Sequence, residues 1–284
     1  MNPSPLFQLE SAGYAPTGTE ILVDINWQIR AGEHWAILGP NGSGKTTLLK
    51  VATGYLWPTS GRVLRRGREL IDLYELRRSM GWLSSDMISQ IPRDETALET
   101  VVSGKFGQFG LKWLESVMPS REDFAQAAIQ LERVDCQSLA EKPFGLLSQG
   151  ERQQVLIART GMAGPTMLIL DEPCAGMDPG VRERFLSWLA DRLQDATFPT
   201  VLFSTHHLEE IVPGIDWAFC LRSGREVATG KVAEVLGAES IAALYDTPVA
   251  RVINRGGRYW PVWGSEEEES PPRNEIRRFV CVGR

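Results

Sequence analysis

The chain has 284 residues, of which 43% are hydrophobic and 23% charged, and its formal net charge is −6. This is ordinary globular composition, long enough for one large domain or two modest ones. Glu266 to Glu269 account for much of that charge, so the remainder is close to neutral and no nucleic-acid partner is expected. No stretch approaches the roughly 20 apolar residues of a membrane span, and no secretory signal is visible at the N-terminus.

The cysteines predict the compartment in which the protein works. The chain has four of them, without metal-type spacing and too few for a disulfide framework. Reduced thiols in a cytoplasmic protein are therefore expected. If the protein acts at a membrane, a separate chain must hold it on the cytoplasmic face.

The first part of the chain predicts short strands separated by turns. Apolar runs near residues 21–29 and at 35–38 follow breaks at Gly13, Pro16 and Gly18. Residues 63–64 predict a hairpin strand, residues 70–78 a helix, and residues 80–83 a further strand. From residue 84 to about 147 the apolar spacing is mostly helical, which predicts an inserted helical subdomain.

After residue 152 the chain alternates between helices and strands. Helices are expected at 150–162, 180–194 and 207–212, and strands at 167–170, 201–204, 217–221 and 225–228. Such alternation predicts a mainly parallel sheet with both faces covered. The predicted domain bounds are a cassette at 1–239, with its core at 1–84 and 148–239 and its helical part at 85–147, and an extension at 240–284. Within the extension, residues 265–275 are expected to be disordered.

A phosphate-binding loop follows the strand at 35–38. Residues 39–46 match the pattern G-x-x-x-x-G-K-[ST], and the loop with its next residue consists of Gly39, Pro40, Asn41, Gly42, Ser43, Gly44, Lys45, Thr46 and Thr47. Glycines let several backbone N–H groups face one anion, and the helix that follows directs its positive end at the same point. Lys45 is expected on the β- and γ-phosphates, and the Thr46 hydroxyl on Mg²⁺. Nucleotide binding is the prediction.

Two acidic residues end the apolar run at 167–170. A buried parallel strand would deliver Asp171 to its carboxyl end, where ligand sites of α/β proteins form. Asp171 is predicted to hold Mg²⁺, directly or through water, and Glu172 to orient and deprotonate the attacking water. Because a phosphate loop precedes them, solvated carboxylates without a function are the weaker interpretation.

Three further segments complete the pattern. A turn of Ser148, Gln149, Gly150 and Glu151 opens a helix and offers a hydroxyl and free N–H groups at its positive end. Asp178 lies in a tight turn beyond the two acids. His206 follows the strand at 201–204, one of only three histidines in the chain. Alone, the first turn would be interpreted as a helix cap and the histidine as a loop residue.

In this order the segments resemble the ATP-binding cassette (ABC) ATPases over about residues 6–235. The resemblance implies an α/β P-loop NTPase fold with a mainly parallel central sheet, an N-terminal antiparallel β subdomain and an inserted helical subdomain. It implies that Ser148 and Gly150 contact the γ-phosphate held by a partner subunit, and that Asp178 lies at the dimer contact. By the same resemblance, His206 is expected to sense the γ-phosphate. Tyr14 is the candidate for stacking on adenine, and a tyrosine that only packs in the core is an equally good interpretation.

The chain departs from the family in two motifs: the pattern Leu-Ser-Gly-Gly-Gln, and a glutamine after the strand at 80–83. Gln149 and Glu151 replace the third and fifth residues of the first motif. At the glutamine position stands Ser85, an uncertain Mg²⁺ contact, which is too short to reach as a glutamine does. Either Ser85 acts through a water, or Gln90 replaces it, or the contact is absent. This departure concerns coupling to the membrane partner more than ATP binding.

The resemblance implies an ATPase subunit that hydrolyses ATP, with Mg²⁺, between two cassettes in a homodimer and powers a separate membrane permease. A narrower likeness to molybdate-transport-like and metal-chelate importer ATPases rests on residues 84–85, 96–98, 148–152, 244–249 and 256–260.

The alternative is a soluble ABC ATPase without a permease, which would act on nucleic acid or ribosomes or have a regulatory role. Such proteins carry long coiled coils or tandem cassettes, and this chain has one cassette. A GTP switch would need an Asn-Lys-x-Asp motif, which is absent, and an inactive binding module stays open.

Overall fold

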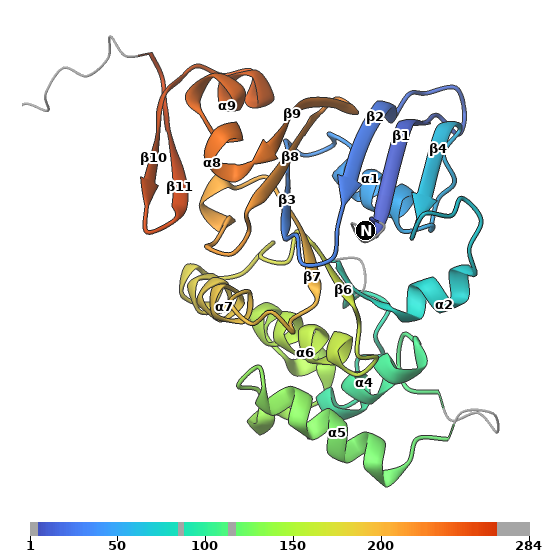
Figure 1. Cartoon of the computed structure of the whole chain (residues 1–284). Helices are drawn as coiled ribbons and strands as arrows, with labels where there is room; N and C mark the ends of the chain where they lie inside the picture. Colours follow the sequence, from blue (N-terminus) through green and yellow to red (C-terminus); the bar gives the residue numbers. More distant parts are fainter. Residues whose placement is uncertain (1–4, 85–87, 113–117, 266–284) are drawn as a thin grey trace, which may run out of the picture.

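The computed structural model describes residues 5–84, 88–112 and 118–265. Within these ranges the centre of the molecule is a six-stranded sheet in the order β5-β6-β7-β3-β8-β9 (Figure 1). Its strands are β3 (Trp35–Leu38), β5 (Met80–Ser84), β6 (Met167–Asp171), β7 (Thr200–Thr205), β8 (Trp217–Arg222) and β9 (Arg225–Lys231). Neighbouring pairs are parallel except β8 and β9, so the predicted mainly parallel sheet is confirmed.

The register of the parallel strands brings the residues at their carboxyl ends together at one edge of the sheet. Every residue of β3, β6 and β7 is buried, as expected for strands covered on both faces. Leu38 pairs with Thr205, and Asp171 pairs with Ser204. The carboxyl ends of the three strands therefore meet, and the residues that follow them lie close together.

A second, antiparallel sheet packs beside the first. It has the order β2-β1-β4, with β1 (Phe7–Tyr14), β2 (Leu22–Ile29) and β4 (Ser60–Arg65). Its apolar side chains share a core with helix α1 (Lys45–Ala52) and with one face of the central sheet. The expected strand at 63–64 lies in β4, but it pairs with β1 instead of forming a hairpin of its own. The predicted N-terminal antiparallel subdomain is confirmed.

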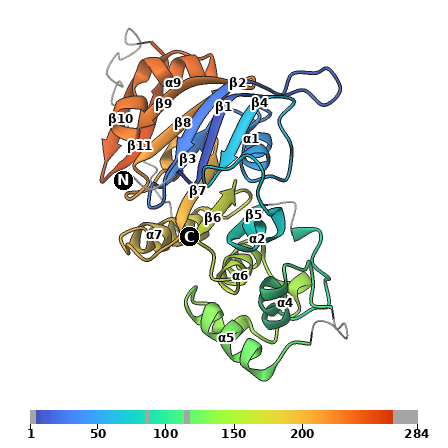
Figure 2. The same ribbon diagram turned by 45° about the vertical axis from the view of Figure 1, so that its right-hand side comes forward.

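Helices gather at the other end of the molecule (Figure 2). They are α4 (Ala97–Ser103), α5 (Arg121–Glu132), α6 (Gln149–Gly161) and α7 (Pro179–Arg192), with short 3₁₀ turns η1 (Gly104–Phe106), η2 (Gln137–Leu139) and η3 (Phe144–Leu146). Thr96 with Glu99, and Ser120 with Asp123, form capping boxes that start α4 and α5. On α6, Arg159 donates to Ser103 Oγ and the Gln108 carbonyl, so α6 is tied to the inserted helices. The domain bounds given above stay a prediction.

Two expected helices differ in length. The helix expected at 70–78 is α2 (Leu73–Arg78), because Asp72 accepts a hydrogen bond from the Glu75 N–H and starts it there. The helix expected at 207–212 is only the 3₁₀ turn η4 (Leu208–Glu210). Pro213 follows, and a residue before proline is disfavoured in the α conformation.

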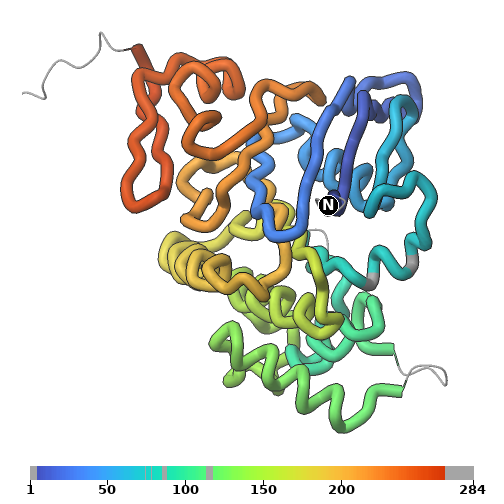
Figure 3. Tube along the Cα trace, viewed as in Figure 1, coloured from blue at the N-terminus to red at the C-terminus, as the bar shows by residue number. Residues whose placement is uncertain are grey.

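The chain ends in a helix pair and a hairpin. Helices α8 (Val232–Val235) and α9 (Ala238–Tyr245) pack on β8 and β9, and β10 (Val249–Arg255) pairs with β11 (Arg258–Trp263). In the tube view this C-terminal hairpin, β10–β11, lies at the opposite side of the central sheet from β1, β2 and β4 (Figure 3). Among the described residues no helix is both long and apolar enough to cross a membrane. The disorder expected for 265–275 lies, apart from its first residue, outside them.

Candidate active site

The phosphate loop joins β3 to α1 in a conformation that needs glycine. Gly44 has a φ of 104° and Gly42 a φ of 76°, both in the region that other residues avoid. A Cβ on Gly39 would lie 2.1 Å from the Leu221 carbonyl oxygen, so the loop passes directly against β8. These constraints keep the loop tight at the start of α1, as a phosphate cradle requires.

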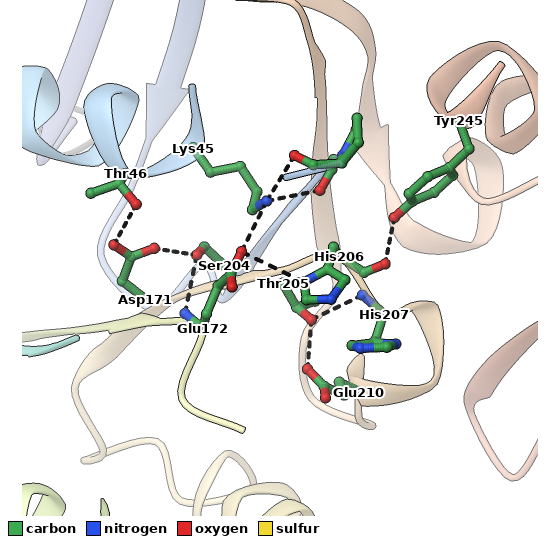
Figure 4. Close-up of polar contacts among 12 residues, drawn as sticks. Lys45, Thr46, Asp171, Glu172, Ser204, Thr205, His206, His207, Glu210 and Tyr245 are labelled. Carbon is green, nitrogen blue, oxygen red and sulfur yellow. Dashed lines mark hydrogen bonds and ion pairs between the residues drawn. The ribbon is translucent and has the colours of Figure 1, made fainter. Parts of the chain in front are cut away.

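Lys45 is the first residue of α1 and is 5% exposed. Its ammonium donates to the Gly39 carbonyl at 2.8 Å and to the Pro40 carbonyl at 3.1 Å. The same nitrogen lies 3.1 Å from Glu172 Oε1 (Figure 4). The Lys45 ammonium thus bridges the loop and Glu172, the acid that follows β6, which is where an anionic ligand would be held.

A chain of hydroxyls holds the buried carboxylate at the end of β6. Thr46 donates to Asp171 Oδ2 at 2.7 Å, and Ser204 on β7 donates to Asp171 Oδ1. Asp171 is 5% exposed, and burial raises its pKa despite both hydrogen bonds. The carboxylate is therefore oriented on both oxygens, at a cost in desolvation that a bound cation would offset.

The donor set suits Mg²⁺. The Thr46 hydroxyl and the Asp171 carboxylate are hard oxygen ligands in direct contact with each other. Mg²⁺ is usually bound by one or two carboxylates together with substrate phosphates and waters, so a small protein donor set is sufficient. Among the residues that the structure describes, no cluster of three or more His, Cys, Asp or Glu side chains is arranged for a metal.

Glu172 faces the same point from a constrained backbone. Its φ is 50°, and its N–H donates to the Ser204 carbonyl at 3.0 Å. A non-glycine residue in this region is uncommon and is typical of functional sites. His206 Nδ1 lies 3.6 Å from Glu172 Oε1, too far for a hydrogen bond. Burial lowers the pKa of His206, and the neighbouring His207 lowers it further, which favours the neutral imidazole.

The switch segment is defined as residues 205–211, from the last residue of β7 onward. The Thr205 hydroxyl donates to the carboxylate of Glu210, and the His207 N–H donates to Thr205 Oγ1 at 3.0 Å. Glu210 is 3% exposed, and burial raises its pKa. Figure 4 shows His206 directed toward Glu172 while Glu210 lies on the other side of Thr205. Hydrogen bonds between its own residues thus stabilise the switch segment.

The turn before α6 forms a capping box. Ser148 Oγ accepts from the Glu151 N–H at 3.3 Å, and the Ser148 N–H donates to Glu151 Oε2 at 2.7 Å. The hydrogen bond from the Ser148 N–H to the carboxylate is the largest cause that lowers the pKa of Glu151. Glu151 therefore completes the cap as a carboxylate, which accounts for an acid at the fifth position of this motif.

The other two residues of that turn link it to the segment after β6. Gln149 donates to the Ala175 carbonyl at 2.8 Å, and a Cβ on Gly150 would lie 2.4 Å from Val181 Cγ1. In the described part of the chain, no hydrogen bond or ion pair joins this turn to the phosphate loop. The Ser148 hydroxyl thus serves its own helix and is separate from its own chain's Lys45.

The remaining candidates lie at the margins of the site. Asp178 is the N-cap position of α7, followed by Pro179. Tyr14 ends β1 partly buried, and its carbonyl accepts from the Ile21 N–H, next to Gly44. Its adenine-stacking role stays a prediction. Ser85 lies outside the described residues. Sequence reasoning missed Ser204, whose signal was a hydroxyl at the end of a buried strand.

Comparisons with known proteins agree on one family. Residues 22–175 match the family model described as ABC transporter. An uncharacterized ABC transporter ATP-binding protein of Bacillus subtilis, YlmA, is 36% identical over 253 residues, covering 88% of this chain and 94% of the relative. A solved ABC transporter described as metal-chelate type has a TM-score of 0.72 at 25% identity, covering 92% of this chain and 97% of that one. A bacterial ABC transporter cassette solved as a dimer has a TM-score of 0.66 at 25% identity, covering 80% and 98%.

Proposed function

Because this chain belongs to the ABC transporter family, we propose that it hydrolyses ATP at a site formed by the phosphate loop, Asp171, Glu172 and His206. The chain is an ATP-binding and ATP-hydrolysing subunit of the kind that powers a separate permease. What we assign beyond the family is the role of each side chain.

These roles are supported by one observation: the residues that follow β3, β6 and β7 lie close together at one point. Lys45 lies 3.1 Å from Glu172, and Thr46 lies 2.7 Å from Asp171. His206 lies 3.6 Å from the same carboxylate oxygen that Lys45 approaches. A γ-phosphate between these groups would meet a cation, a neutral imidazole and a base.

Each residue has a distinct task in the proposed reaction. Lys45 and the loop N–H groups hold the phosphates and stabilise the charge that develops on the transferred group. Thr46 and Asp171 would hold Mg²⁺, which supplies positive charge to the same phosphates. Glu172 orients a water in line with the γ-phosphate and accepts its proton. His206 donates to the γ-phosphate and fixes its position.

A second copy of the chain completes the site in this proposal. The Ser148 turn makes its contacts with its own helix and with Ala175, and the phosphate loop of the same chain is not among its partners. The positive end of α6 thus remains available to a phosphate bound elsewhere. That a structural relative is a dimer supports two cassettes facing each other, with Asp178 at their contact.

The membrane partner is also a proposal. A solved neighbour is described as an ABC transporter of metal-chelate type, and this chain covers 97% of the matching chain. No helix among the described residues is long and apolar enough to cross a membrane. We infer a separate polytopic partner, with this chain on the cytoplasmic face. The same relative agrees with the likeness to metal-chelate importers, although fold alone does not determine cargo.

Replacing Glu172 by glutamine tests the assignment of the base. The variant should lose about 10²- to 10⁴-fold in kcat, the contribution typical of general base catalysis, while still binding ATP. With Mg-ATP it should accumulate as a dimer in light scattering. Glu132→Gln, the same change on the exposed surface of α5, is the control and should behave as wild type. A Glu172→Gln variant with unchanged turnover would refute the role.

A further inference from the structure

The His206 carbonyl is held by a part of the chain that follows the cassette. Within the switch segment, the Thr205 side chain bonds to Glu210 and to the His207 N–H. The Glu210 N–H also donates to the His207 carbonyl, and the Ile211 N–H to the Leu208 carbonyl. None of them engages the peptide carbonyl of His206. Beyond β7 the only regular structure in this segment is the short turn η4. Its geometry therefore depends on what packs against it from outside.

Tyr245 supplies one outside contact. It ends α9, and its hydroxyl donates to the His206 carbonyl at 2.7 Å (Figure 4). The ring is fixed edge-to-face against Trp263 of the C-terminal hairpin, with ring centroids 5.7 Å apart. Burial raises the pKa of Tyr245, so the hydroxyl keeps its proton and stays a donor at physiological pH.

Arg258 supplies a second contact from β11. Its Nε donates to the Glu209 carbonyl at 2.7 Å. The other end of the guanidinium pairs with both carboxylate oxygens of Glu183 on α7. A planar guanidinium holds two partners in fixed relative positions. The hairpin thus connects the switch segment to α7, the helix whose N-cap is Asp178.

We propose that Tyr245 and Arg258 are positioning residues that hold the main chain of the switch segment, so that the His206 imidazole reaches the γ-phosphate in register. The proposal rests on the function assigned to His206 above. His206 Nδ1 lies 3.6 Å from Glu172, just beyond hydrogen-bond distance, so a small shift of its backbone changes what it can contact. Misplacement by about 1 Å is enough to cost roughly 10²-fold in rate in well-oriented sites.

The test removes one hydroxyl. Tyr245→Phe in the full chain should lower kcat for ATP roughly fivefold, the factor that corresponds to one lost neutral hydrogen bond, with KM changed less than about twofold. Arg258→Lys, which cannot hold Glu209 and Glu183 together, should change kcat in the same direction. Tyr259→Phe on the same strand is the control, since its hydroxyl makes no hydrogen bond within the described residues, and it should match wild type.

A double variant separates positioning from general destabilisation. In a His206→Ala background the Tyr245→Phe change should have no further effect on kcat, because the histidine through which it acts is gone. A loss as large as in the wild-type background would overturn the inference. The inference would also be overturned if Tyr245→Phe left kcat unchanged while His206→Ala lowered it. That result would leave the proposed function of His206 intact. A His206→Ala variant with full activity would contradict the role of His206 itself.

Discussion

Asp171 offers a prediction in which stability and function move in opposite directions. The side chain is 5% exposed and accepts hydrogen bonds from Thr46 and Ser204, yet burial still raises its pKa. Asp171→Asn removes the buried charge and keeps the shape. The amide oxygen can accept from one hydroxyl, and the amide N–H can donate to the other, since hydroxyls do both. Both hydroxyls therefore keep a hydrogen-bond partner.

The expected gain in the free energy of unfolding is roughly 0.5–2 kcal/mol, the range of single stabilising changes. For a chain of this size that corresponds to a rise in Tm of about 2–4 °C per kcal/mol. The rate of Mg-ATP hydrolysis should nevertheless fall about 10²-fold or more. Asp171→Asn removes the carboxylate that would hold Mg²⁺ against the charge developing on the transferred phosphoryl group. With Mg-ATP at 100 times its Kd, the wild type should gain about 2.7 kcal/mol and overtake the variant.

The pH dependence gives a second measurement on the same variant. Burial raises the pKa of Asp171 in the folded state above its ordinary value of 3.8. Below that value the wild-type side chain is neutral in both states, so the two proteins should have similar Tm values. As the pH rises through the folded-state pKa, the wild type loses stability relative to Asp171→Asn, and the difference in Tm should grow and then level off.

Differential scanning fluorimetry without nucleotide, repeated across pH, measures this difference. Asp191→Asn, the same substitution on an exposed part of α7, is the control and should leave Tm nearly unchanged. If Asp171→Asn is less stable than wild type at neutral pH, or if the difference does not change with pH, the argument from burial is wrong.

Two further predictions concern the Ser148 turn and the departure at Ser85. Gly150→Ala places a Cβ 2.4 Å from Val181 Cγ1 and should destabilise the fold by about 1–3 kcal/mol. Val181→Ala should restore most of the lost Tm, and the absence of any rescue in thermal unfolding would refute this contact as the cause. Ser85→Gln should change the rate of hydrolysis by a modest factor and leave ATP binding intact. Loss of nucleotide binding in a filter assay would contradict a role confined to coupling.

Much of the site could be predicted because its motifs are contiguous. The phosphate loop and the Asp171–Glu172 pair each carry a local reason for their chemistry, namely a strand that delivers them and a turn or helix that follows. A helix cap at Ser148 was also considered from the sequence, whereas its capping box with Glu151 was found in the structure. For α2, Asp72 was present as a start signal although residues 70–78 were predicted to be helical as a whole.

What was missed depends on contacts between distant parts of the chain. Ser204 reaches Asp171 only because β6 and β7 are paired in one register, which no local pattern reveals. Tyr245 touches His206 across 39 residues of sequence. At residues 207–212 the apolar spacing resembles a helix, but burial against the core and Pro213 set the local structure. The contacts and local structure at these positions are determined by tertiary packing.

A mixing experiment tests the central claim, that each nucleotide is held between the phosphate loop of one copy and the Ser148 turn of another. Lys45→Ala and Ser148→Arg should each be inactive alone. Mixed in equal amounts they should regain roughly a quarter of wild-type activity, since about half of the dimers are mixed and each of those has one intact site of two. Recovery of hydrolysis on mixing is the predicted result, and a mixture that stays as inactive as its parts would contradict the account.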